Sequence, residues 1–158
     1  MKKMSVLWVL MAVLLVFSFQ GLNAAEDGGL FLNVGLITDD SLSFKPLQWM
    51  AGLSIDFPFG SALCISPECY AVVNKLEFDT LALAPGIMLN LNLDSLFVGG
   101  GVTKWFNIGD VAMYNTDFML KLNAGLKSKS LKLTAFAIMA FDNLFKNMSL
   151  GVTLGFIF

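Results

Sequence analysis

The sequence predicts an all-β protein: an antiparallel up-and-down transmembrane β-barrel of eight strands, preceded by a signal peptide that is cleaved. Three observations lead to this fold class. The chain of 158 residues is 56% hydrophobic and only 14% charged, whereas about a quarter of the residues of a soluble domain are usually charged. Its first segment has the pattern of a secretion signal. The remainder alternates between apolar and polar or small residues, which is the period of a β-strand.

Residues 1–25 are predicted to be the signal peptide. Lys2 and Lys3 form a positive region, an almost unbroken apolar run covers 6–19, and 21–25 supply small residues suited to cleavage. The apolar run is short for a membrane-spanning helix, so cleavage is favoured over an uncleaved anchor. The mature chain would be one β-barrel domain, residues 26–158. It contains no run of eighteen apolar residues that could form a further spanning helix.

The C-terminal segment shows the strand pattern most clearly. From Met148 onward, period two separates two sets of side chains onto opposite faces. The first set is wholly apolar: Met148, Leu150, Val152, Leu154, Phe156 and Phe158. The second is mostly small or polar: Ser149, Gly151, Thr153, Gly155 and Ile157. A barrel with lipid outside and a narrow lumen inside requires these two faces.

Six other stretches alternate in the same way, namely 30–37, 48–57, 81–92, 96–106, 118–127 and 131–142. Pro85 interrupts one of them, and we expect a β-bulge there because proline cannot donate a ladder hydrogen bond. Residues 61–74 would supply an eighth, less regular strand, since an even number lets the first and last strands pair antiparallel. Turns near 58–60, 93–95 and 128–130 would lie at one end with both termini. Connections near 39–46, 74–76, 107–114 and 143–147 would lie at the other.

Two features resemble a known family. The segment from Pro85 to Leu91 and the segment from Phe97 to Val102 together resemble the central hairpin of the opacity-type outer-membrane β-barrel family. The last strand resembles the signal that the barrel-assembly machinery recognises, which would consist of Leu150, Val152, Leu154, Phe156 and Phe158. The resemblance implies a bacterial outer-membrane location and roles from adhesion to membrane integrity. The short outer connections depart from the family pattern and put a large adhesive surface in doubt.

Polar residues on the predicted inner faces form a candidate lumen network. They are Asn33, Asp56, Asn90, Asn92, Lys121, Asn123, Lys132 and Thr134. Such residues could line a pore or a binding site, but the lumen of an eight-stranded barrel is normally filled by side chains. A satisfied interior network is therefore the favoured interpretation. Aromatic residues near strand ends, including Trp49, Trp105, Tyr114 and Phe118, are expected to form belts at the lipid headgroups.

Cys64 and Cys69 allow two exclusive interpretations. In one regular strand their Cα atoms would be about 16 Å apart, which is too far for a disulfide. A disulfide therefore requires residues 65–68 to turn back, and Pro67 favours a turn. We favour the disulfide, which an exported location permits. The alternative is a continuous strand with two free thiols.

The composition argues against catalytic, metal-binding and nucleic-acid-binding functions. The chain has no His, which removes the commonest general base and metal ligand, and its net charge of −2 offers no basic surface to nucleic acid. We expect a monomeric, non-catalytic structural or surface protein of the outer membrane without cofactor or metal. Its partners would be outer-membrane lipid and, during biogenesis, the barrel-assembly machinery. Two alternatives are a conduit for small apolar solutes and, with less support, a soluble periplasmic carrier barrel.

Overall fold

The structure is a computed structural model that describes residues 28–39, 42, 47–74, 77–108, 117–142, 144 and 148–157, with the backbone alone at 77–80. The predicted signal peptide, Tyr114 and Phe158 lie outside these residues. The described strands are β1 (Gly29–Ile37), β2 (Gln48–Phe59), β3 (Leu63–Asn74), β4 (Glu77–Leu93), β5 (Leu96–Lys104), β6 (Phe106–Ile108), β7 (Phe118–Lys127), β8 (Leu131–Ala140) and β9 (Met148–Ile157).

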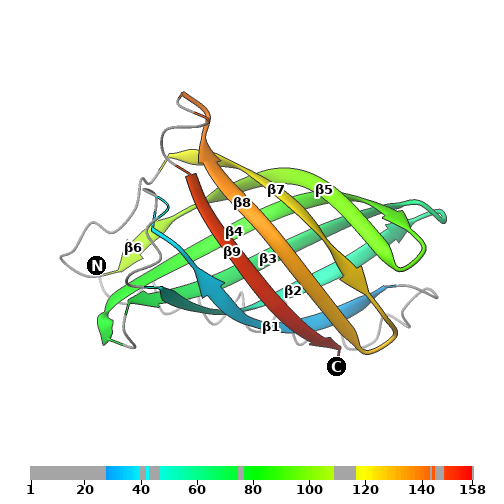
Figure 1. Ribbon diagram of the computed structural model, residues 1–158, viewed down its shortest axis with the longest axis horizontal. Coiled ribbons are helices and arrows are strands. Elements are labelled where there is room, and N and C mark those ends of the chain that lie inside the picture. The colour runs from blue at the N-terminus through cyan, green and yellow to red at the C-terminus, as the bar shows by residue number, and fades with distance from the viewer. Residues whose placement is uncertain are drawn as a thin grey trace, which may run out of the picture.

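The strands close into an antiparallel barrel with eight positions around its wall (Figure 1). Short β6 continues β5, because both pair with β4: Phe106 lies opposite Leu83, and Thr103 lies opposite Gly86. The barrel closes where β1 pairs with β9, from Phe31 opposite Ile157 to Ile37 opposite Gly151. In Figure 1, red β9 accordingly lies between blue β1 and orange β8. The predicted eight-stranded, up-and-down barrel is confirmed.

The two faces of each strand differ as the alternation predicts. Along β1, Phe31, Asn33 and Ile37 are buried in the lumen, while Leu32 and Val34 are exposed on the outside. The same separation holds in β9, where Ser149 and Thr153 are buried. Met139 is an exception, since it occupies an outward position of β8 but is only 5% exposed.

Residues 63–74 form one continuous strand, although a turn was expected at 65–68. β3 runs without a break through both cysteines, which are free thiols, so the favoured disulfide between Cys64 and Cys69 is wrong. The two residues are separated by an odd number of positions, and alternate side chains of a strand point to opposite faces. Cys64 is therefore buried in the lumen and Cys69 is exposed on the outside. The continuous-strand alternative describes this segment.

Proline is accommodated by gaps in the hydrogen-bond ladder. Pro67 pairs with Ile87 on β4, but the ladder from β3 to β2 is interrupted at Ser66 and Pro67. At Pro85 the ladder is interrupted between β5 and β6, with the same register on both sides. The bulge expected at Pro85 is therefore wrong; an interruption suffices because only the missing N–H must be tolerated. A register shift occurs instead in β3, between Val72 and Asn74.

Tight connections gather at one end of the barrel, which we call the turn end. They lie at 60–62, 94–95 and 128–130, two residues later than predicted in the first case and as predicted in the other two. Gly60 and Asp94 adopt positive φ angles of 69° and 57°, which favour glycine and tolerate Asp. β1 begins and β9 ends here as well. The opposite end is called the loop end; its four predicted connections lie wholly or partly outside the described residues.

Candidate functional site

All eight residues of the predicted lumen network occupy inward positions. Six are buried: Asn33, Asp56, Asn90, Lys121, Lys132 and Thr134. Asn123 and Asn92 are half-buried, and Asn92 lies at the turn end of the lumen. Glycines on β5 provide the space for these side chains. A Cβ atom at Gly99 would collide with the amide oxygens of Asn90 and Asn123 from the two neighbouring strands.

Asp56 is the centre of one charged cluster. Lys132 Nζ donates to both of its carboxylate oxygens, at 2.8 and 3.0 Å, and Lys127 Nζ donates to Oδ2 at 2.9 Å. Ser66 Oγ donates to Asp56 Oδ1 at 2.8 Å and accepts a 2.9 Å bond from Asn90 Nδ2. Strands β2, β3, β4, β7 and β8 thus contribute to one network across the lumen. These hydrogen bonds and ion pairs link the five strands through the interior, whereas the buried side-chain oxygen of Asn90 has no hydrogen-bond partner among the described residues.

A second ion pair lies nearer the middle of the barrel, between Lys121 on β7 and Glu68 on β3. Only 3% and 6% of their side-chain areas are exposed. The Lys121 ammonium also lies 4.7 Å from the ring centroid of Tyr70 and 4.6 Å from that of Phe136. A desolvated cation over aromatic faces gains up to about 2 kcal/mol per ring. Lys121 is therefore held by one carboxylate and two rings.

Sequence reasoning missed three participants in these clusters: Glu68, Ser66 and Lys127. Glu68 and Ser66 were missed because they lie in the segment to which a turn was assigned. Strand alternation holds the signal that would have identified them, since Cys64, Ser66, Glu68 and Tyr70 follow one another on the inner face of β3. Lys127 ends β7 on the same face as Lys121 and was detectable in the same way.

Apolar side chains fill the loop end of the lumen. Tyr70, Trp105, Phe136, Met50 and Val72 belong to one buried cluster there. Trp105, expected in an outer aromatic belt, is only 1% exposed. Its position explains the error, because it continues the inward series of Phe97, Gly99, Gly101 and Thr103. Trp49 and Phe118 are exposed, as a belt requires.

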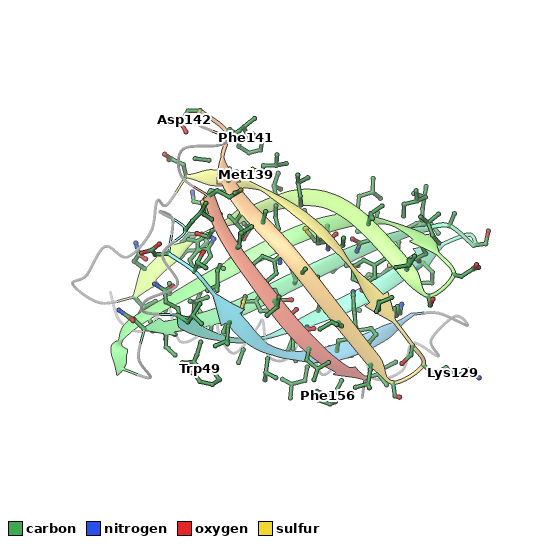
Figure 2. All side chains as sticks on the ribbon, in the orientation of Figure 1. Trp49, Lys129, Met139, Phe141, Asp142 and Phe156 are labelled. Atoms are coloured by element: carbon green, nitrogen blue, oxygen red, sulfur yellow. The ribbon has the colours of Figure 1, made fainter. Side chains whose placement is uncertain are left out.

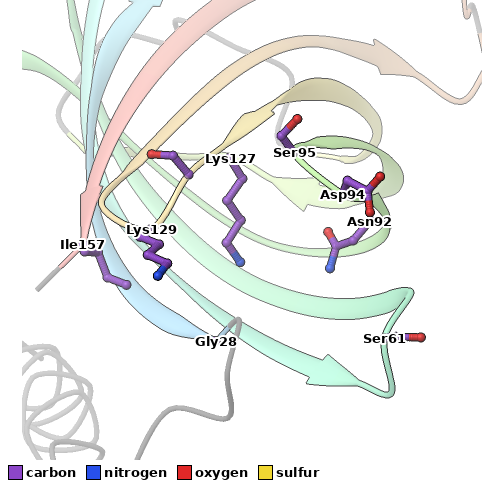
Figure 3. Close-up of a pocket in the computed structure, with 9 residues that line it drawn as sticks. Gly28, Ser61, Asn92, Asp94, Ser95, Lys127, Lys129 and Ile157 are labelled. Atoms are coloured by element: carbon purple, nitrogen blue, oxygen red, sulfur yellow. The ribbon is translucent and has the colours of Figure 1, made fainter.

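At the turn end the lumen opens into a hollow of about 700 Å³ (Figure 3). Its lining is polar and charged for the most part, and includes Asn92, Asp94, Ser95, Lys127 and Lys129. Figure 3 shows Lys127 extending from β7 into this opening. Lys127 forms an ion pair with Asp56, so the protein's own carboxylate partly compensates the positive charge at the bottom of the hollow. Among the described residues, no group of three or more His, Cys, Asp or Glu is placed to hold a metal ion.

The outer surface of the barrel is almost free of polar side chains. Every described side chain at an outward strand position is apolar, Gly, Pro or Cys, with the single exception of Lys104. Exposed examples in the middle of the wall are Leu89, Leu122, Leu133 and Val152. Figure 2 shows Trp49 and Phe156 projecting from the outside of the wall. This band encircles the barrel.

The apolar stripe of the last strand belongs to this band. Leu150, Val152, Leu154 and Phe156 are all exposed on the outside of β9. Phe158, the last member of the proposed assembly signal, lies outside the described residues. Recognition of the stripe by an assembly machinery stays a prediction.

Within the described part of the chain, no helix has the length and apolar character needed to cross a membrane. Comparison with protein-family models, with curated proteins and with solved structures gave no match.

Proposed function

We propose that the mature chain is an integral β-barrel of a bacterial outer membrane, similar to the opacity-type barrels, with a structural or surface role and no catalysis. One observation carries this proposal: apart from Lys104, no charged or polar side chain lies at a described outward strand position. The charged groups Asp56, Glu68, Lys121 and Lys132 point into the lumen instead.

An apolar outer surface of this extent is stable in hydrocarbon and not in water. Soluble proteins rarely expose a continuous apolar patch larger than a few hundred Å², and this band surrounds the whole barrel. Hydrocarbon accepts apolar side chains without cost, but it accepts no unpaired backbone N–H or C=O group. Closure of β1 onto β9 pairs the edges that would otherwise be left open. An apolar exterior and a closed ladder are the two properties that a spanning barrel needs.

The alternatives receive less support from the same observations. A soluble carrier barrel would place its apolar faces around a ligand and its polar faces in water, which is the reverse of the arrangement found here. A conduit would need a passage, whereas Tyr70, Trp105 and Phe136 fill the loop end of the lumen. A non-catalytic role is supported by the absence of His from the sequence, and by the use of the inward carboxylates in ion pairs.

Cell fractionation tests the proposal. Cells that express the full chain should carry the protein in outer membranes, where washing with alkaline carbonate leaves it in the pellet and detergent releases it. The folded protein should migrate differently on denaturing gels before and after heating, and its N-terminus should begin after Ala24 or Ala25. Recovery in the soluble periplasmic fraction would contradict the proposal and favour the carrier.

A further inference from the structure

Lys104 is the one charged side chain that the described outer wall carries. It is the last residue of β5 and pairs with Phe118, the first residue of β7, near the loop end. Its neighbours on the same outer surface, Phe106 and Phe118, are 48% and 59% exposed. The lysine thus lies between two exposed rings at the border of the apolar band.

The two rings hold the ammonium group but do not neutralise it. Lys104 Nζ lies 5.5 Å from the ring centroid of Phe106 and 5.1 Å from that of Phe118. Among the described residues, no carboxylate forms an ion pair with Lys104. A lysine ammonium has three hydrogens to donate, and a ring face accepts them only weakly. The group therefore retains both its charge and most of its capacity to donate.

The surroundings decide which anion fits. Inside hydrocarbon an uncompensated ammonium is costly, so a lysine on a lipid-facing wall extends its flexible stem toward the headgroup level. At that level the available anion is a lipid phosphate. The two exposed rings would contact the glycerol and upper acyl segments of the same lipid, which a free phosphate ion does not possess. Charge and apolar rim together match an amphiphile with an anionic head.

We propose that Lys104, Phe106 and Phe118 form a binding site for the phosphate headgroup of an anionic membrane lipid in the leaflet at the loop end. The site rests on the proposed membrane location. Lys104 supplies the charge and the hydrogen bonds. Phe106 and Phe118 hold the ammonium in place and cover the neck of the lipid.

Native mass spectrometry of the folded protein, purified from membranes in detergent, tests this site. The protein is titrated with phosphatidylglycerol and, separately, with phosphatidylcholine. Lys104→Gln should weaken phosphatidylglycerol binding about fivefold, the ratio that corresponds to about 1 kcal/mol per basic residue at an anionic surface. It should leave phosphatidylcholine binding unchanged. Lys129→Gln is the matched control, because Lys129 is an exposed lysine at the turn end, and it should retain the original affinity.

Three outcomes would overturn the site: equal phosphatidylglycerol affinity of the original protein and Lys104→Gln, an equal loss in Lys129→Gln, or displacement of the lipid by the same concentration of inorganic phosphate. Should Lys104→Gln fail to fold, Lys104→Met, which suits a lipid-facing wall, should show the same loss. Insertion into phosphatidylcholine vesicles is measured in parallel. Failure of the original protein to insert refutes the membrane location, whereas insertion without any effect at Lys104 refutes the lipid site alone.

Discussion

The buried ion pair between Lys121 and Glu68 tests how the lumen is stabilised. Removing one partner of a buried pair costs about 3–5 kcal/mol, because the other charge remains unpaired. In Glu68→Gln the Tyr70 and Phe136 rings still contact the ammonium and the Gln oxygen can still accept a hydrogen bond, so we expect a loss of about 3 kcal/mol. In Lys121→Met the cation–π interactions with the two rings disappear as well, and we expect a loss of about 5 kcal/mol.

The double substitution separates pairing from packing. With both Glu68→Gln and Lys121→Met no charge is left unpaired at this site, and we expect the barrel to recover to within about 2 kcal/mol of the original stability. The assay is reversible urea unfolding in phosphatidylcholine vesicles, followed by tryptophan fluorescence, with the exposed Lys129→Gln as a control that should shift stability by less than about 0.5 kcal/mol. If the double variant loses the sum of the two single losses, the residues are not coupled and the reasoning fails.

Three other predictions follow from the wall and its last strand. Leu122→Lys places a charge on the outer face, against lipid in the proposed membrane, and should cost about 2–4 kcal/mol in the same unfolding assay. Leu122→Met should cost less than about 1.5 kcal/mol; equal losses would shift the inside–outside assignment by one residue. Thiol labelling of the denatured, unreduced protein should find two reactive cysteines, and in the folded protein in membranes a small apolar maleimide should react with Cys69 well before Cys64. The absence of any adduct on the denatured protein would support the disulfide instead. Deleting Phe158 should lower assembly in cells more than refolding into detergent, and equal losses in both would make it a packing residue only.

The alternation of side chains was sufficient to predict most of the wall. In β1, β2, β4 and β9 every inward and outward assignment follows from period two, because an apolar outer face and a narrow lumen leave each position a single environment. In β3 composition misled the prediction. Pro67 between two cysteines has the composition of a turn, yet a proline in a strand needs only a gap in one ladder, and the structure provides it on the side of β2.

The partners within the lumen could not be predicted from spacing. Lys132 on β8 meets Asp56 on β2 across the barrel, and the two residues are 76 positions apart. Which inward residues face one another depends on the tilt and stagger of the strands, which the pattern of a single strand does not contain. The burial of Trp105, by contrast, could have been predicted. Its place, continuing the inward series of β5, indicates a lumen position, but the expectation of an aromatic belt was preferred to it.

The seam between β1 and β9 has a consequence for how the barrel forms. It joins the beginning and the end of the described barrel: the Leu150 amide donates to Thr38 Oγ1 at 2.9 Å across 112 positions of sequence. Pairing between such distant segments is slow, because the entropy of closing the loop is lost before any contact is gained. Until β9 has been synthesised and has reached β1, the edge of β1 has no partner, and the intermediate exposes its Leu- and Phe-rich faces. A chain that is not yet closed, with an unpaired strand edge and exposed apolar faces, is prone to aggregate, and it remains so until the final strand arrives.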